Sequence, residues 1–350
     1  MFEAYSYWTI ACLVLGGLII IPTIMGFFAG NKFEVDGKTV LLTGASEGMG
    51  KAVAKELASK GASIVIVARN VGKLEEALEE IKASAKDPSA QRFQYISTDL
   101  SEPSAALLVI AEAIAWNKGN SPDIVWCLAG SSYPAFWIDT PVSKLRSQMD
   151  VNYWAATEMA HAILNEWLSP SALAERMVGS PPKHLVFTSS VLAFYSTVGY
   201  GAYSPTKAAL RSLGDTLAQE LQIYGGGEAA KVHVVCPGTI ATAGFERENL
   251  TKPEITKQLE DADPIGSPEE VAVSAIKRLE NGEYLIVCNW LGSLMRSQSW
   301  SGMRRGNWLL ETVMTWFTSL LWIFLQRDLD GKVRKYGIKN GHPGTYPKKQ

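Results

Sequence analysis

The stretch GAYSPTKAAL, residues 201–210, contains a tyrosine and a lysine four positions apart. If the stretch is helical, Tyr203 and Lys207 share one face, where the ammonium can stabilise a phenolate and so prepare the phenol for proton transfer. Such pairs also arise by chance, as a solvated lysine beside a half-buried tyrosine. The pair therefore indicates catalysis only if other parts of the chain supply partners for it.

The composition argues against several classes of function. The chain has 350 residues and a formal net charge of −2, so we expect no nucleic-acid partner. The four cysteines and four histidines are scattered along the chain, so we predict neither a disulfide framework nor a metal site. Hydrophobic residues make up 47% and charged residues only 19%, an apolar balance for a soluble enzyme.

Short apolar runs alternate with helical stretches from about residue 37 to residue 290. The runs KTVLLTG (38–44) and SIVIVAR (63–69) are rich in β-branched residues and predict strands buried on both faces. Repeated strand–helix units predict an α/β fold with a Rossmann-type, doubly wound parallel sheet. The further predicted strands are at 93–100, 123–130, 184–190, 231–238 and 284–289.

A glycine-rich turn, TGASEGMG, follows the first predicted strand and opens the next helix. Gly44, Gly48 and Gly50 allow a tight turn and the close approach of a pyrophosphate to the helix N-terminus. Arg69 ends the second strand, where chains that bind NAD have an acidic residue for the ribose hydroxyls. A guanidinium instead suits a 2′-phosphate, so NADPH is the predicted cofactor.

Residues near this turn complete the predicted adenosine end of the cofactor site. Ser46 and Lys73 are expected to add contacts to the 2′-phosphate. Asp99, at the end of the third strand, is the predicted partner of the adenine amino group, with Leu100 beside it. Glu47 has the wrong charge for a phosphate, so we expect it to point into solvent.

The chain resembles the short-chain dehydrogenases/reductases over about residues 37–290. Ser190 lies thirteen residues before Tyr203, as the family pattern requires, which makes chance a poor explanation for Tyr203 and Lys207. One departure is CLAG (127–130), where many members have Asn-Asn-Ala-Gly; it puts the strand-to-strand bonding of the missing asparagine in doubt. The matching positions, in the family's order, are the glycine turn, Asp99, Ala129, Gly130, Asn152, Ser190, Tyr203, Lys207, Pro237 and Gly238.

The resemblance implies a role for each of these side chains. Tyr203 protonates the ketone oxygen as hydride arrives, and Ser190 donates a hydrogen bond to that oxygen. Lys207 and the positive nicotinamide ring of the oxidised cofactor together stabilise the phenolate, and this is expected to lower the pKa of the phenol by about three units. Lys207 also binds the nicotinamide ribose, while Asn152 holds a water that relays protons. The remaining implied cofactor contacts are Ala129, Gly130, Pro237, Gly238, Ile240 and Thr242, the last two on the carboxamide.

The segment TAGFERENLTKPEIT (242–256) resembles a stretch of the 3-ketosphinganine reductases, especially fungal ones. The resemblance implies reduction of a long-chain sphingoid ketone to sphinganine with NADPH, beneath a substrate lid at 240–265. Phe245 and Leu250 are expected to shield the alkyl chain. The polar members Glu246, Glu248 and Asn249 are expected either to face the substrate's ammonium and hydroxyl or to lie solvated in a loop.

Residues 4–31 form a segment without any charged residue. This segment is longer than the roughly 20 apolar residues that are needed to span a bilayer. It predicts an uncleaved N-terminal anchor; a cleaved signal peptide is disfavoured because the start lacks a basic region. Lys32 and the basic residues after it favour placing the rest of the chain in the cytosol. The resemblance implies the endoplasmic reticulum membrane, with its lipids as partners and the catalytic domain facing the cytosol.

A second apolar segment, WLLETVMTWFTSLLWIFL, covers residues 308–325. Glu311, Thr315, Thr318 and Trp322 recur in it at helical spacing and leave a weakly polar stripe. A full membrane span and an interfacial or re-entrant helix therefore both remain open. The predicted domains are an N-terminal membrane anchor (1–36), an NADP-binding catalytic domain (37–290) and a C-terminal membrane-associated segment with its tail (291–350).

Two other functions stay open at this point. One is a membrane-anchored reductase of the same family that acts on a 3-ketoacyl-CoA or a steroid. The other is a non-catalytic, cofactor-sensing subunit, which is disfavoured because such proteins usually lack the tyrosine or the lysine. The sequence leaves the oligomeric state open, although members of the family commonly form homodimers through the helices that carry Asn152 and Tyr203.

Overall fold

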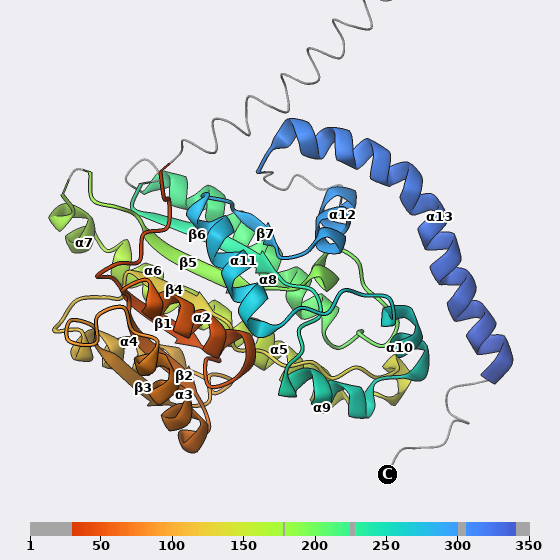
Figure 1. The fold of residues 1–350 in the computed structure, drawn as a ribbon, viewed down its shortest axis with the longest axis horizontal. Coiled ribbons are helices and arrows are strands. Elements are labelled where there is room, and N and C mark those ends of the chain that lie inside the picture. The colour runs from red at the N-terminus through yellow and green to blue at the C-terminus, as the bar shows by residue number, and fades with distance from the viewer. Residues whose placement is uncertain (1–29, 178, 225–227, 300–305, 341–350) are drawn as a thin grey trace, which may run out of the picture.

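The computed structural model describes residues 30–177, 179–224, 228–299 and 306–340. A seven-stranded parallel sheet in the order β3-β2-β1-β4-β5-β6-β7 forms its centre (Figure 1). This confirms the predicted α/β fold with a Rossmann-type sheet. The strands are β1 (Thr39–Thr43), β2 (Ser63–Ala68), β3 (Phe93–Ser97), β4 (Ile124–Cys127), β5 (Lys183–Thr188), β6 (Ala230–Cys236) and β7 (Leu285–Val287).

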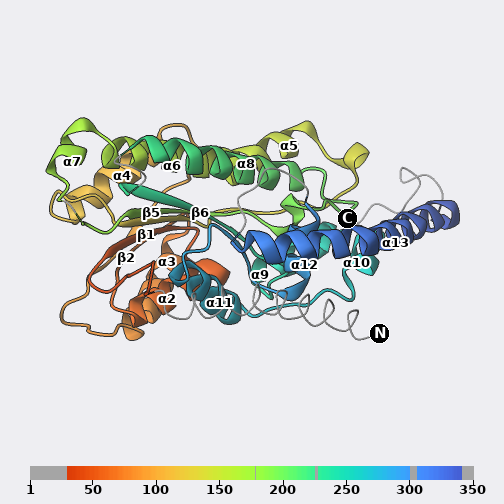
Figure 2. The ribbon, with the colours of Figure 1, turned by 90° about the horizontal axis from the view of Figure 1, so that it is seen from above.

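Two layers of helices cover the two faces of the sheet (Figure 2). Successive residues of a strand point to opposite faces; in β2, Ile64 and Ile66 therefore enter one core, and Val65 and Val67 enter the other. The first core is covered by α2 (Gly48–Ser59), α3 (Val71–Ala83) and α11 (Pro268–Glu280), and the second by α4 (Ala105–Trp116), α6 (Ala155–Trp167) and α8 (Ser204–Glu220).

The chain reverses its direction of travel across the sheet between β1 and β4. Parallel sheets of this kind leave a crevice at such a switch point, outside the carboxyl ends of the strands. The hydroxyl of Thr43, at the end of β1, accepts hydrogen bonds from the N–H groups of Leu128 and Ala129, both at 3.1 Å. These bonds join the two strand ends within CLAG, where the family's missing asparagine had left the bonding in doubt.

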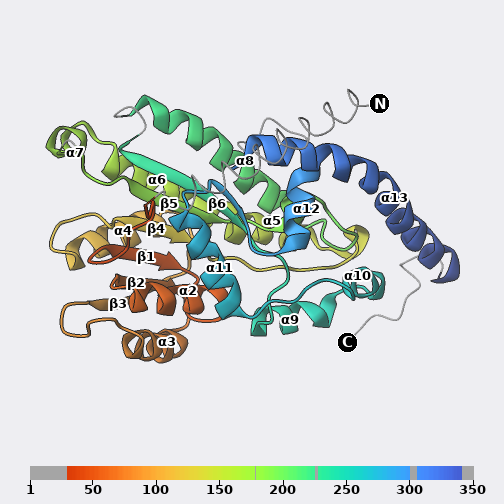
Figure 3. The same cartoon turned by 45° about the horizontal axis from the view of Figure 1, so that its top comes forward.

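The remaining described α-helices lie at both ends of the sheet (Figure 1). Short helices α5 (Val142–Met149) and α7 (Pro170–Glu175) flank α6, whereas α9 (Ala243–Thr251) and α10 (Glu254–Glu260) form most of the predicted lid. Beyond β7, α12 (Trp290–Gln298) is followed by the long α13 (Trp308–Asn340), which runs past α12 and α10 (Figure 3). The predicted N-terminal anchor lies almost wholly outside the described residues.

Candidate active site

A cavity of about 680 Å³ opens at the carboxyl ends of the central strands. It lies at the switch point and extends beneath α9, so that strand ends, glycine turn and lid all contribute to its wall. Of the predicted catalytic and cofactor-binding residues, Asn152 alone lies outside the lining. The predicted residues that line the cavity are Gly44, Ser46, Gly48, Gly50, Arg69, Lys73, Asp99, Leu100, Ala129, Gly130, Ser190, Tyr203, Lys207, Pro237, Gly238, Ile240 and Thr242.

Tyr203 and Lys207 lie at the start of α8, one turn apart. The Lys207 Nζ lies 5.6 Å from the centroid of the Tyr203 ring and donates a hydrogen bond to the carbonyl of Thr188, at 2.9 Å. Ser190, just beyond β5, shares a side-chain hydrogen bond with Tyr203. Residues from a strand end and a helix start thus place a hydroxyl, a phenol and an ammonium together.

Burial has the largest effect on the pKa of the Tyr203 phenol. It raises the pKa of Tyr203 above its usual value, the carboxylate of Glu248 adds to the rise, and the hydrogen bond from Ser190 opposes it. Desolvation therefore keeps this pKa high in the structure described here, where the Lys207 ammonium is turned toward Thr188. The expected lowering depends also on the positive nicotinamide ring and stays a prediction. A phenol that keeps its proton is the form that can donate one.

Asn152 is fully buried in a π-helical turn, Asp150–Trp154, between α5 and α6. Its amide donates a hydrogen bond to the carbonyl of Ser131 and accepts one from the Ser131 N–H, both at 2.9 Å. A Cβ on Gly130 would lie only 2.8 Å from the Asn152 Oδ1 and 3.2 Å from the Lys207 Nζ. Asn152 therefore fixes the backbone that passes closest to the lysine.

The glycine turn forms a cradle that side chains would fill. Gly44 has a φ of +66°, and a Cβ there would lie 2.6 Å from the Cα of Ala129; a Cβ on Gly50 would lie 2.2 Å from the Gly44 carbonyl oxygen. The N-terminus of α2, with its free N–H groups, begins in this turn at the cavity wall. The cradle fits the pyrophosphate of a dinucleotide.

Comparison with known proteins identifies the family. Residues 38–253 match the family described as short chain dehydrogenase. The chain is a member of the short-chain dehydrogenase family.

Two curated fungal relatives cover almost the whole chain. It is 49% identical to 3-ketodihydrosphingosine reductase gsl-3 of Neurospora crassa, over 98% of this chain and 94% of that protein. It is 45% identical to 3-ketodihydrosphingosine reductase ksrA of Aspergillus fumigatus, over 96% of this chain and 95% of that protein. The fold also resembles that of L-sorbose reductase from Gluconobacter frateurii, solved with NADPH and L-sorbose, with a TM-score of 0.59 at 22% identity over 74% of this chain and 98% of that one.

Arg69 and Asp99 face one another at the rim of this short-chain dehydrogenase's cavity. The Arg69 Nη1 lies 3.4 Å from the Asp99 Oδ2, and the Arg69 side chain is 73% exposed. Asp99 also accepts hydrogen bonds from the N–H and hydroxyl of Ser101. An exposed ion pair of this kind contributes little stability, so the guanidinium can turn toward a phosphate at small cost.

Glu47 does not point freely into solvent, contrary to expectation. Its carboxylate pairs with Lys73 on α3 and with Arg247 on α9, each at 2.5 Å. Burial would raise the pKa of Glu47, but the hydrogen bonds from Lys73 and Arg247 outweigh that effect and lower it. Glu47 therefore links the glycine turn to the lid, and the predicted phosphate contact of Lys73 competes with this pair.

The lid residues divide between the cavity and the surface. Phe245 and Glu248 line the cavity, whereas Leu250 is 69% exposed and, like Glu246 and Asn249, lies outside the lining. Within the predicted lid, α10 and the turn after it add two acidic residues that the sequence analysis missed. These are Glu260 and Asp263, which carry no recognisable motif.

Lys252, from the TKPE stretch, supports the lid from inside the protein. Its side chain is 1% exposed, and its Nζ lies 2.7 Å from the Glu260 carboxylate and 4.6 Å from the centroid of the Phe245 ring. Glu260 also forms a side-chain hydrogen bond with Tyr200, which lies next to the catalytic segment. The Lys252–Glu260 pair therefore joins the two lid helices to one another, and the Glu260–Tyr200 hydrogen bond attaches the lid to the turn before α8.

We expect kcat/KM for the cofactor, which reports the free enzyme, to fall above pH 8. Burial lowers the pKa of Lys207 to about 8, so the ammonium is charged below that pH and is lost above it. The decline should approach tenfold per pH unit. Initial rates between about pH 6 and pH 10 measure it, and a flat profile to about pH 10 would contradict the assignment.

Proposed function

We propose that this short-chain dehydrogenase reduces 3-ketosphinganine to sphinganine with NADPH. One observation carries the proposal: fungal 3-ketodihydrosphingosine reductases match it at 49% and 45% identity over nearly the whole chain. The cavity supports the same reaction type, because a serine, a tyrosine and a lysine with the family's spacing meet at its wall.

The proposed chemistry assigns each side chain one task. The cofactor, when bound, supplies a hydride for the carbonyl carbon. Ser190 donates a hydrogen bond to the carbonyl oxygen, which gains the electron pair of the breaking π bond. Tyr203 transfers its proton to that oxygen, giving the alcohol, and the charged Lys207 stabilises the phenolate left behind. Asn152 positions the backbone beside Lys207, and its proposed relay water would return the proton.

The acidic residues Glu248, Glu260 and Asp263 in the cavity lining suit the substrate's ammonium. This ammonium lies on the carbon next to the ketone. Glu248 is close enough to Tyr203 to raise the pKa of the phenol. Burial raises the pKa of Glu248 to about 7 and that of Asp263 to about 6. We therefore propose Glu248 as the carboxylate that pairs with the ammonium, strengthened by the negative charge of Asp263.

Glu248→Gln is expected to raise KM for 3-ketosphinganine about tenfold and to change kcat by less than about threefold, because it removes one charge-assisted contact. The effect should grow as the pH rises through 7, since Glu248 is charged above its pKa of about 7. Glu246→Gln is the matched control, because Glu246 lies on the same helix outside the cavity lining. Equal KM values for both variants would contradict the role.

The proposed setting is the cytosolic face of the endoplasmic reticulum membrane. Two apolar segments support it: residues 4–31, outside the described structure, and Trp308–Leu325, which is long and apolar enough to cross a membrane. A long-chain ketone dissolves in the same membrane, so anchoring confines enzyme and substrate to one surface.

A substrate assay tests the proposed function directly. The full chain, purified in detergent, is given NADPH with 3-ketosphinganine, and the absorbance of the reduced cofactor is followed; NADH is run in parallel. Turnover with NADPH is expected. Turnover of a 3-ketoacyl-CoA but not of 3-ketosphinganine would reject the substrate, and cofactor binding without turnover of either would favour a non-catalytic subunit.

A further inference from the structure

Helix α13 turns its polar side chains inward. Glu311, Thr315 and Thr318 are only 8%, 1% and 2% exposed. Their spacing of three and four residues places them, with Trp322, on one face of the helix, and this face lies against the catalytic domain. A helix on the surface of a water-soluble protein normally has the opposite arrangement, with its apolar residues inward.

The opposite side of α13, here called the outer face, is wholly apolar. Its six residues are between 49% and 69% exposed and contain no charge or hydrogen-bonding group apart from one indole N–H group. An apolar surface of this extent marks an interaction site. The outer face consists of Val313, Trp316, Phe317, Leu320, Ile323 and Phe324.

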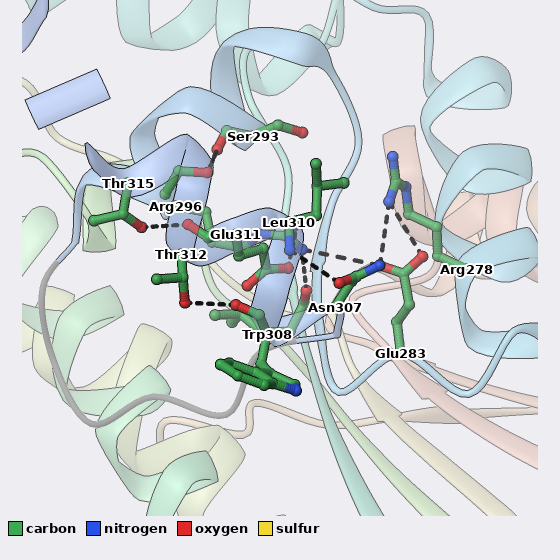
Figure 4. Close-up of polar contacts among 12 residues, drawn as sticks. Arg278, Glu283, Ser293, Arg296, Asn307, Trp308, Leu310, Glu311, Thr312 and Thr315 are labelled. Atoms are coloured by element: carbon green, nitrogen blue, oxygen red, sulfur yellow. Dashed lines mark hydrogen bonds and ion pairs between the residues drawn. The ribbon is translucent and has the colours of Figure 1, made fainter. Parts of the chain in front are cut away.

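A buried ion pair attaches the start of α13 to the domain (Figure 4). The Arg296 Nη2 on α12 lies 2.9 Å from the Glu311 carboxylate, and the side chains are 13% and 10% exposed. Arg296 also donates a hydrogen bond to the carbonyl of Leu285 in β7, at 2.8 Å. The pair therefore fixes which side of α13 faces the protein.

A second contact holds α13 three turns later. The ring of Trp322 packs edge-on against Tyr195, with centroids 5.0 Å apart. At 1.5 Å per residue, Glu311 and Trp322 are about 16 Å apart along the helix. The domain thus lies beside most of the apolar length of α13, and a helix so held cannot pass through a bilayer core without drawing the domain into it.

The threonine and serine hydroxyl groups of α13 are paired within the helix. Thr312, Thr315, Thr318 and Ser319 donate hydrogen bonds to the carbonyls of Trp308, Glu311, Met314 and Thr315, at 2.5–2.7 Å. Residues 326–340, which continue the helix, contain five basic and two acidic residues, a balance that favours anionic lipid headgroups.

We propose that α13 is an interfacial helix that lies in one leaflet of a phospholipid bilayer, with its axis parallel to the membrane and the outer face in the acyl region. The apolar outer face, the inward polar stripe and the basic continuation match this surface and not a span. Residues 308–325 therefore dock the catalytic domain onto the leaflet.

The position of α13 also bears on the cavity. Helix α12 presents Leu291 and Met295 to the cavity and Arg296 to α13, so one short helix separates the membrane-facing helix from the site. If the proposed function is correct, a membrane-dissolved ketone reaches the cavity sideways from the leaflet, past α12.

Depth measurements on the full chain test this arrangement. Val313, Phe317 and Phe324 are replaced singly by Cys, labelled with an environment-sensitive fluorophore, and reconstituted into phosphatidylcholine/phosphatidylglycerol vesicles. Lipids carry a spin label near the headgroup or near the bilayer centre. The extent of fluorescence quenching at the three positions is expected to agree to within about twofold. The spin label near the headgroup should quench more strongly than the one near the bilayer centre, because a helix lying in the membrane plane is roughly 5–10 Å deep. Leu108→Cys on α4, 71% exposed, should not be quenched, and the unsubstituted chain gives the background.

Two outcomes would overturn the proposal. A span predicts that Phe317→Cys lies near the bilayer centre and that an impermeant maleimide reaches Lys335→Cys and Leu108→Cys from opposite sides of the vesicle. An interface between two copies predicts a disulfide between Phe317→Cys chains with no quenching by lipid.

Leu320→Glu, with Leu108→Glu as its control, adds a functional measurement. Leu320→Glu is expected to lower the quenching at position 317 at least about twofold and to raise KM for the vesicle-borne ketone, while KM for a short, water-soluble ketone stays unchanged. Loss of quenching in both variants would contradict the role of the outer face. The depth readout needs no turnover, so it stands if the substrate assignment fails.

Discussion

Tyr203→Phe is expected to lower kcat for the ketone about a thousandfold, which corresponds to ~4 kcal/mol of transition-state stabilisation. The substitution removes only the hydroxyl that shares a hydrogen bond with Ser190. The pKa of this phenol is raised by burial, so at neutral pH the hydroxyl carries the proton that the product needs. Steady-state reduction of 3-ketosphinganine measures the loss.

Tyr284→Phe is the matched control for this experiment. Its hydroxyl donates a 2.8 Å hydrogen bond to Asp215, and its side chain lies outside the cavity lining. It should keep activity within about twofold while losing ~1 kcal/mol of stability. Cofactor binding, followed by fluorescence, should persist in Tyr203→Phe. Full activity in Tyr203→Phe would remove it from the proposed mechanism.

Arg69→Asp is expected to reverse the cofactor preference. The guanidinium at the cavity rim is exposed and, among the described residues, pairs with Asp99 alone. A carboxylate there would repel a 2′-phosphate and could accept bonds from ribose hydroxyls. KM for NADPH should rise about 100-fold, equivalent to ~2.7 kcal/mol, and KM for NADH should fall. The ratio of kcat/KM for the two cofactors measures the change.

Arg146→Asp controls for the change in net charge, because Arg146 is exposed on α5 and does not line the cavity. It should leave the ratio of the two cofactors unaltered. An unchanged ratio in Arg69→Asp would mean that another group, such as Lys73 released from Glu47, selects the cofactor.

Local patterns of the sequence predicted the architecture because they depend on near neighbours. The run SIVIVAR predicted β2, which covers Ser63–Ala68, and KTVLLTG predicted β1, Thr39–Thr43. Helical stretches were expected between the strands, but between β4 and β5 the helices α5 and α6 are separated by the π-helical turn that buries Asn152. That turn depends on the bonds of Asn152 to Ser131, which no local periodicity reports.

The sequence by itself determined the order of strands and helices, the glycine turn and the spacing of Ser190, Tyr203 and Lys207, because strand ends and one helical turn set those positions locally. Tertiary structure alone decided that Glu47 pairs with Arg247, 200 residues away, and that burial raises the pKa of Tyr203. It also decided which side of α13 faces the protein. Pairings and desolvation depend on what the folded chain brings near each group, and sequence spacing does not contain that information.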